Sequence, residues 1–137
     1  MKESQLTKAE EYVFSYSRRE AIDDGVLVDV SNLGKEAGIR FPVAVTAAVW
    51  HGYIEPNEKL EEAGQSSAGR LWDVLNVFVY EVRKLIKAGR ADNDLILFKV
   101  LFLMEADESP KEVQLKGIVS GGDDGAPVFT IMLPDED

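Results

Sequence analysis

The chain has 137 residues, 45% of them hydrophobic, which suffices to bury one core at this size and argues against two domains. Its 15 basic and 25 acidic residues give a formal net charge of −10, which repels a phosphate backbone and argues against a conventional DNA or RNA binder. The sequence has no cysteine and one histidine, which excludes disulfides, thiolate chemistry and multi-histidine metal sites, so we expect neither a metal nor a cofactor.

The start of the chain is polar, with Leu6 and Ala9 as the apolar positions of residues 1–11. This composition predicts a polar tail, frayed or disordered, ahead of a single domain over residues 12–137. The first residues lack the apolar core of a signal peptide, and no apolar run approaches the length of a membrane span. We therefore expect a cytoplasmic protein that does not enter a membrane.

The first part of the domain predicts short elements. Residues 12–16 are β-prone. The segment Ser17-Arg-Arg-Glu20 matches a capping box, so a short helix should begin at Ser17 and end before Gly25. Residues 26–30 predict a strand, and Ser31 should cap a helical turn that Gly38 ends.

A second helix is predicted over residues 42–54. Pro42 suits its first position, where a missing N–H costs nothing. The apolar residues with helical spacing are Val43, Ala47, Trp50 and Ile54. The polar segment over residues 57–67 is typical of an exposed loop.

The clearest element is an amphipathic helix over residues 67–88, whose apolar residues recur at three and four positions and whose last turn is basic. Three strands are predicted after it, over residues 95–104, 112–119 and 127–133. The first is apolar on both faces apart from Lys99, so we expect it at the centre of the sheet. Between the last two strands, residues 121–125 (GGDDG) fit a hairpin turn better than a phosphate loop or a cation site.

Together these segments predict an α+β domain. An antiparallel sheet of three to four strands, including residues 26–30, should pack on the long helix.

No part of the sequence carries a catalytic signature, and we assign no catalytic residue. His51 has no nucleophile or ligand set near it in the sequence, which favours a packed or surface residue. Ser66 and Ser67 suit a helix cap, and neither lies in a nucleophile elbow.

Four segments resemble a bacterial family, a domain of unknown function that occurs in chromosomes, plasmids and phage-like elements. They are residues 16–31 (YSRREAIDDGVLVDVS), 41–50 (FPVAVTAAVW), 69–75 (GRLWDVL) and 122–137 (GDDGAPVFTIMLPDED). The resemblance covers nearly the whole chain and leaves the polar tail before Tyr12 outside. It implies no activity, ligand or catalytic residue.

The segments that carry the resemblance mix aromatic and polar side chains, which suits a cleft for a small ligand or a peptide if the two long helices meet. The candidate cleft residues are Tyr16, Arg18, Thr46, Trp50, Arg70, Trp72 and Asp73. Val77 and Tyr80 point away from the apolar stripe of their helix. We expect them either to be covered by neighbouring elements or to form an interface with a partner or a second copy.

Three functions are open at this point. The first is a non-enzymatic interaction or accessory module of a bacterial or mobile-element system, with a protein partner or as a homodimer. The second is a nucleic-acid mimic that inhibits a host DNA-binding protein, which the net charge favours and the interspersed basic residues disfavour. The third is an enzyme or small-ligand binder with a cleft near Trp50, Arg70 and Asp73.

Overall fold

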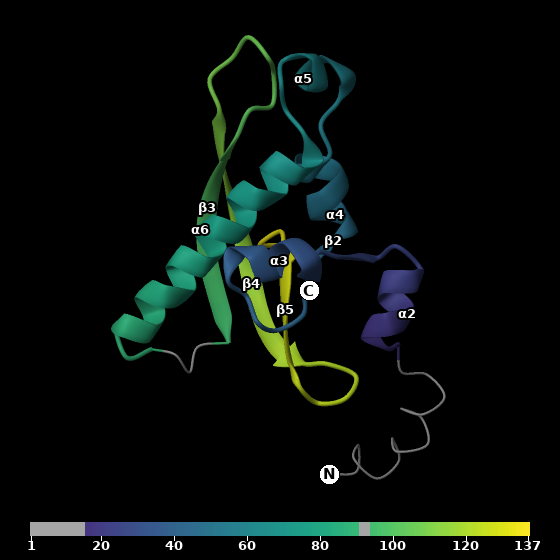
Figure 1. The fold of residues 1–137 in the computed structure, drawn as a ribbon, viewed down its shortest axis with the longest axis vertical. Coiled ribbons are helices and arrows are strands. Elements are labelled where there is room, and N and C mark those ends of the chain that lie inside the picture. Colours follow the sequence, from purple (N-terminus) through teal and green to yellow (C-terminus); the bar gives the residue numbers. More distant parts are fainter. Residues whose placement is uncertain (1–15, 91–93) are drawn as a thin grey trace.

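The protein is described by a computed structural model, which covers residues 16–90 and 94–137 and has a five-stranded sheet with helices (Figure 1). The strands are β1 (Leu27–Asp29), β2 (Val43–Thr46), β3 (Leu95–Phe102), β4 (Lys111–Gly121) and β5 (Pro127–Met132). Their order in the sheet is β1-β2-β5-β4-β3. The pair β2–β5 is parallel and the other pairs are antiparallel. The predicted tail over residues 1–11 and the β-prone residues 12–15 lie outside the described residues.

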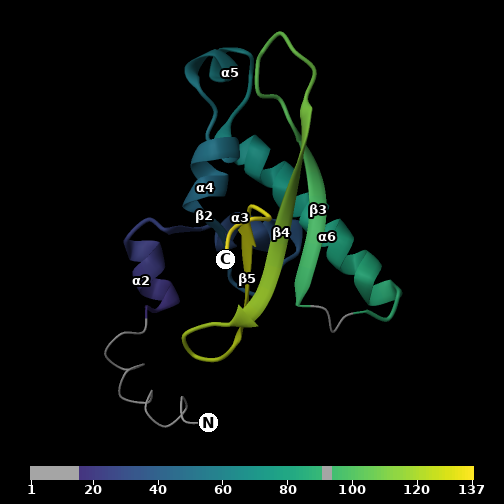
Figure 2. The same ribbon diagram turned by 180° about the vertical axis from the view of Figure 1, so that it is seen from behind.

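The helices of the described ranges are α2 (Arg18–Asp23), α3 (Ser31–Ala37), α4 (Ala47–Val49), α5 (Glu58–Glu62) and α6 (Ser67–Lys87), with a π-helix, η1 (Trp50–Ile54), after α4. The long helix α6 crosses β3 and contacts α3 and η1 (Figure 1). From behind, β3 and β4 lie in front of α6 with no described helix over them (Figure 2). No helix in the described ranges is long and apolar enough to cross a membrane.

The structure confirms an α+β fold and the long helix. It also confirms the capping box: the Ser17 side chain accepts from the Glu20 amide, and the Glu20 side chain accepts from the Ser17 amide. The GGDDG segment is the turn between β4 and β5, with Gly125 at a φ of 84°. Two smaller predictions are wrong. The N-cap residue of α3 is Val30 and not Ser31, which is the first residue of the helix. The segment over residues 57–67, predicted as a loop, contains the helix α5.

The predicted helix over residues 42–54 is wrong in its first part, where residues 43–46 form β2. All four residues of β2 are buried because both faces of this central strand are covered, so the strand shows no polar alternation in the sequence. The helical residues start after Thr46, whose hydroxyl accepts from the Val49 amide. The missed strand also explains why the expectation of a purely antiparallel sheet is wrong, since β2 forms the parallel pair with β5.

The expectation of a central position for the strand over residues 95–104 is also wrong, because β3 is at the edge of the sheet. Its residues alternate between exposed and buried. The alternation is hidden in the sequence because leucines occupy the exposed positions.

The core lies between α6 and the sheet. The Phe78 ring of α6 packs on Phe98 of β3 and Phe129 of β5, with centroids 5.4 and 5.2 Å apart. Gly117 of β4 makes room for this ring, because a Cβ atom at residue 117 would lie 2.3 Å from Cε1 of Phe78. The absence of a side chain at this position therefore allows α6 to approach the sheet closely.

Candidate functional site

Two adjoining hollows form a groove where the second half of α6 faces the loop over residues 38–42 and the ends of β4 and β5. They have volumes of about 250 and 230 Å³ and are lined mainly by apolar side chains. Phe41, Val82, Ile86 and Phe129 line both hollows. We call this feature the α6 groove.

The loop that forms one wall of the α6 groove begins at a left-handed glycine. Gly38 has a φ of 103° and ends α3, and the next amide, that of Ile39, donates to the carbonyl of Gly34 at 2.8 Å. This reversal directs Ile39 into the core and leaves Phe41 at the surface, where its ring packs edge-to-face with Phe129, with the ring centroids 6.0 Å apart. The wall is therefore built by local backbone geometry and one aromatic pair.

The opposite wall is the last three turns of α6. Val79, Val82 and Ile86 recur at three and four residues and lie on one side of the helix. Val79 is buried, whereas Ile86 is 57% exposed. Phe41 in the facing wall is 45% exposed, so the groove has apolar side chains open to solvent on both sides.

The rim of the α6 groove is basic. Arg40 and Arg83 line the first hollow, Arg90 lines the second, and Lys35 lines an adjoining hollow with Arg40. Within residues 16–90 and 94–137, none of these four cations has a carboxylate oxygen within 4.0 Å. The acid on the same stretch of helix, Glu81, lies 3.5 Å from Lys84. In a chain of net charge −10, cations that have no carboxylate partner among the described residues thus gather around an apolar surface.

Arg70, a predicted cleft residue, is buried at the other end of α6, with 4% of its surface exposed. Its Nε donates to the Tyr53 carbonyl at 2.8 Å, and its Nη1 donates to the Leu103 carbonyl at 2.8 Å and to Oε1 of Gln65 at 3.0 Å. The guanidinium also lies 5.3 Å from the centroid of the Phe102 ring. Its hydrogen bonds are thus made to the protein itself.

Arg18 lies on the face of the sheet opposite α6. Its Nη1 donates to Oγ1 of Thr130 at 2.7 Å, and its Nη2 donates to the Phe129 carbonyl at 2.8 Å. The Asp123 carboxylate in the β4–β5 turn accepts from the amides of Arg18 and Arg19, which fastens the start of α2 to that turn. Partial burial lowers the pKa of Arg18.

Tyr16 and Thr46 also have partners within the fold. The Tyr16 hydroxyl donates to the Asp24 carboxylate at 2.7 Å, and this hydrogen bond raises the pKa of the phenol. The Thr46 hydroxyl donates to the Glu136 carboxylate at 2.8 Å, which holds the C-terminal residues against the sheet. Both hydroxyl groups thus donate to carboxylates of this chain itself.

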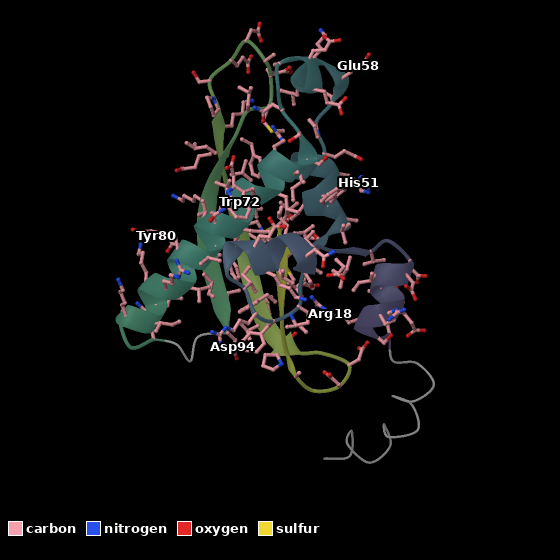
Figure 3. The ribbon with its side chains drawn as sticks, viewed as in Figure 1. Arg18, His51, Glu58, Trp72, Tyr80 and Asp94 are labelled. Carbon is pink, nitrogen blue, oxygen red and sulfur yellow. The ribbon has the colours of Figure 1, made fainter. Side chains whose placement is uncertain are left out.

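The other predicted residues lie on or beside α6. Trp50 and Val77 are partly buried and pack against the core. Trp72 and Tyr80 project from α6 toward solvent, 39% and 61% exposed, well separated from Arg18 on α2 (Figure 3). Asp73 is exposed, and burial lowers the pKa of its neighbour Arg70.

The seven predicted cleft residues are therefore divided between two faces of the sheet and the solvent side of α6. None of them lines the α6 groove. The sequence contained part of the signal for the groove, since the apolar stripe includes Val82 and Ile86 and the last turns are basic. Basic residues in a last helical turn are also explained by the negative end of the helix dipole, so they do not indicate a site by themselves, and only the loop over residues 38–42 completes it.

His51 lies on the surface of η1 (Figure 3), with Nδ1 3.1 Å from Oε1 of Glu55. Across the two described ranges, no three side chains of His, Cys, Asp or Glu come together as metal ligands would.

Comparison with known proteins identifies a family. No curated protein and no solved structure matches the chain. A family of unknown function, DUF6573, matches residues 4–137. The match begins ahead of Tyr12, so the prediction that the polar tail lies outside the shared pattern is wrong. Because the match spans nearly the whole sequence, the chain belongs to the family of unknown function DUF6573.

Proposed function

We propose that this protein is a non-enzymatic interaction module whose α6 groove binds an acidic segment of a partner protein that also carries apolar side chains. One observation carries the proposal: two adjoining apolar hollows lie beneath cations that have no carboxylate partner in the described part of the chain. A groove of this kind supplies both the area and the charge that peptide recognition requires.

The apolar part of the groove would supply most of the affinity. Phe41 and Ile86 are about half exposed, and exposed apolar surface of this kind favours association because binding removes it from water. Two hollows side by side suit two neighbouring apolar side chains of one segment.

The basic rim would select the partner. Arg83 and Arg40 flank the first hollow, and Arg90 lies at the second, so carboxylates spaced along a segment have a cation within reach at each hollow. The rest of this acidic protein repels an acidic segment, which confines binding to the groove.

A peptide fits the groove better than a fatty acid does. An acyl chain requires a deep apolar enclosure with one polar group at its mouth, whereas this groove is open along both walls and has cations distributed along it. Binding of a fatty acid is nevertheless an informative outcome of the test below.

The two other functions have less support. Lys59 and Lys111 lie among the acids of α5 and the β3–β4 loop, which weakens a resemblance to a phosphate backbone. For an enzyme near Arg70, Nε and Nη1 of that residue already donate to the carbonyls of Tyr53 and Leu103.

The test uses fluorescence anisotropy with the full chain and three synthetic peptides. The first alternates Glu with Leu and Phe, the second replaces each Glu with Lys, and the third replaces each Leu and Phe with Ser. We expect the first alone to bind, and Arg83→Glu to weaken it by about tenfold, equivalent to about 1.4 kcal/mol.

Lys111→Glu is the matched control, because it makes the same charge change at an exposed position that does not line the groove. It should leave the affinity within about twofold. Equal losses in the two variants, or binding of oleate with no peptide binding, would contradict the proposal.

A further inference from the structure

The free edge of β3 is an apolar surface that the groove does not use. β3 is the last strand of the sheet, and Leu95, Leu97 and Leu101 are 48%, 50% and 63% exposed on the face away from α6. Edge strands of soluble proteins commonly carry prolines, bulges or several charges that prevent pairing. β3 has a continuous register with β4 and carries Lys99 as its one charged residue.

One hydrogen bond shows which backbone groups of β3 point outward. The Val119 amide of β4 donates to the Asp94 carbonyl at 2.9 Å, so Asp94 and Val119 form a hydrogen-bonded pair. Pairs of this type alternate along an antiparallel ladder, which turns every second residue toward β4. The backbone groups that point to the free edge therefore belong to Leu95, Leu97, Lys99 and Leu101. No described strand pairs with them.

We propose that a second copy of this chain pairs with this edge, β3 against β3, in antiparallel orientation about a two-fold axis at Phe98. In this register Leu95 lies opposite Leu101 of the second copy, and Leu97 lies opposite its Lys99. All four outward residues of each copy then find a partner, which adds about eight backbone hydrogen bonds. The product is one sheet that continues through both copies.

The neighbouring registers are worse. A two-fold axis at Leu97 places Leu101 opposite residue 93, beyond the start of β3. A two-fold axis at Lys99 places two lysines opposite each other, which is repulsive. The β3 sequence is thus self-complementary about Phe98, which favours a second copy over an unrelated strand.

The side chains fit this register on both faces. On the exposed face, Leu95 and Leu101 form an apolar cross-strand pair, and the ammonium of Lys99 lies 3.8 Å from Glu112 of its own copy, which balances its charge beside Leu97. On the other face, a hollow of about 230 Å³ follows the edge between Leu85 of α6 and β3. This hollow provides room for the side chains of the incoming strand.

The experiment measures the mass of the full chain in solution by light scattering after gel filtration. We expect a dimer for the natural sequence. Leu97→Lys places a lysine opposite Lys99 of the second copy and should give a monomer, whereas Leu97→Glu pairs with that lysine and should remain a dimer. Tyr80→Lys is the matched control, since it replaces another exposed hydrophobic residue, on α6 and away from β3, and should remain a dimer.

Hydrogen exchange gives an independent readout that does not depend on a variant. In the dimer the amides of Leu95, Leu97, Lys99 and Leu101 should exchange slowly, and they should become fast in Leu97→Lys, while the even-numbered amides of β3 stay protected in both. A monomeric natural chain, fast exchange at the odd-numbered positions, or the same mass for the lysine and glutamate variants would overturn the proposal.

Discussion

Arg70 and Arg83 lie on the same helix, near its two ends, but they have different surroundings. Arg70 is buried and donates to the carbonyls of Tyr53 and Leu103 and to Gln65. Arg83 is exposed beside an apolar hollow and has no carboxylate within 4.0 Å in the described residues. One end of α6 is internally satisfied and the other offers unused groups to solvent.

This difference indicates a structural role for Arg70 and favours a binding role for Arg83. A buried guanidinium is stable only if its donors are used, so Arg70 ties η1, the segment after α5 and the end of β3 together. An exposed guanidinium without a carboxylate partner costs little free energy of folding, because water solvates it. Such a residue can therefore remain available for a carboxylate of another molecule. Residue type alone therefore does not indicate which arginine binds a partner.

The largest expected effect is the loss of stability in Arg70→Ala. Removing the guanidinium leaves the partly buried carbonyls of Tyr53 and Leu103 without these donors and opens a cavity where the side chain lay, which should lower the free energy of unfolding by about 3 kcal/mol. Urea unfolding measures the change. Arg83→Ala is the matched control at the other end of α6 and should stay within about 0.5 kcal/mol. Equal losses in the two variants would remove the distinction between the two ends.

Gly117→Ala tests the middle of α6, where Phe78 contacts the sheet. The added Cβ would lie 2.3 Å from the Phe78 ring, so either the ring or α6 must shift, at a cost of about 1–3 kcal/mol. Because Phe78 also lines the α6 groove, peptide affinity should fall as well.

Gly52→Ala is the control for that experiment. A Cβ at Gly52 has no heavy atom within 4 Å, and the variant should be as stable as the natural chain or up to about 1 kcal/mol more stable. A stable Gly117→Ala variant would mean that the contact between α6 and β4 is looser than the structure indicates.

The smallest effect concerns an exposed hydrogen bond remote from both ends of α6. The hydrogen bond from Tyr16 to Asp24 raises the pKa of the phenol in the folded state. It therefore adds stability at pH values below about 10, the pKa of the phenol in the unfolded chain. This contribution is lost as the pH rises through the pKa of the folded state. Asp24→Ala should lower the pKa of Tyr16, measured by NMR titration of the ring carbons, with little change in stability near neutral pH.

Asp23→Ala is the control for the titration, because the Asp23 carboxylate lies 3.5 Å from Arg19 and has no hydrogen bond to Tyr16. It should shift the Tyr16 titration less than Asp24→Ala does. A Tyr16 titration that is unchanged in Asp24→Ala would contradict the hydrogen bond.

Local sequence signals predicted those elements whose boundaries depend on nearby residues. The capping box at Ser17, the turn around Gly125 and the three-and-four spacing of α6 each act within a few residues of the chain. Each of these predictions is confirmed. The sequence also indicated the basic end of α6, but not what faces it.

Errors arose where burial on a second face overrides local pattern. β2 lies between β1 and β5 with both faces covered, and its short apolar run matched a helical stripe by coincidence. β3 showed the reverse error, because exposed leucines at alternate positions resemble a strand covered on both sides.

The sequence by itself determined that this is an acidic α+β protein with a long amphipathic helix, because composition and helical spacing are local properties. The tertiary structure decided that Arg70 is buried and donates to carbonyls of the fold, that Arg40 and Arg83 line the same apolar hollow, and that β3 is the edge strand of the described sheet. These outcomes depend on contacts between segments distant in the chain, and no local pattern encodes which surface those contacts cover and which they leave open.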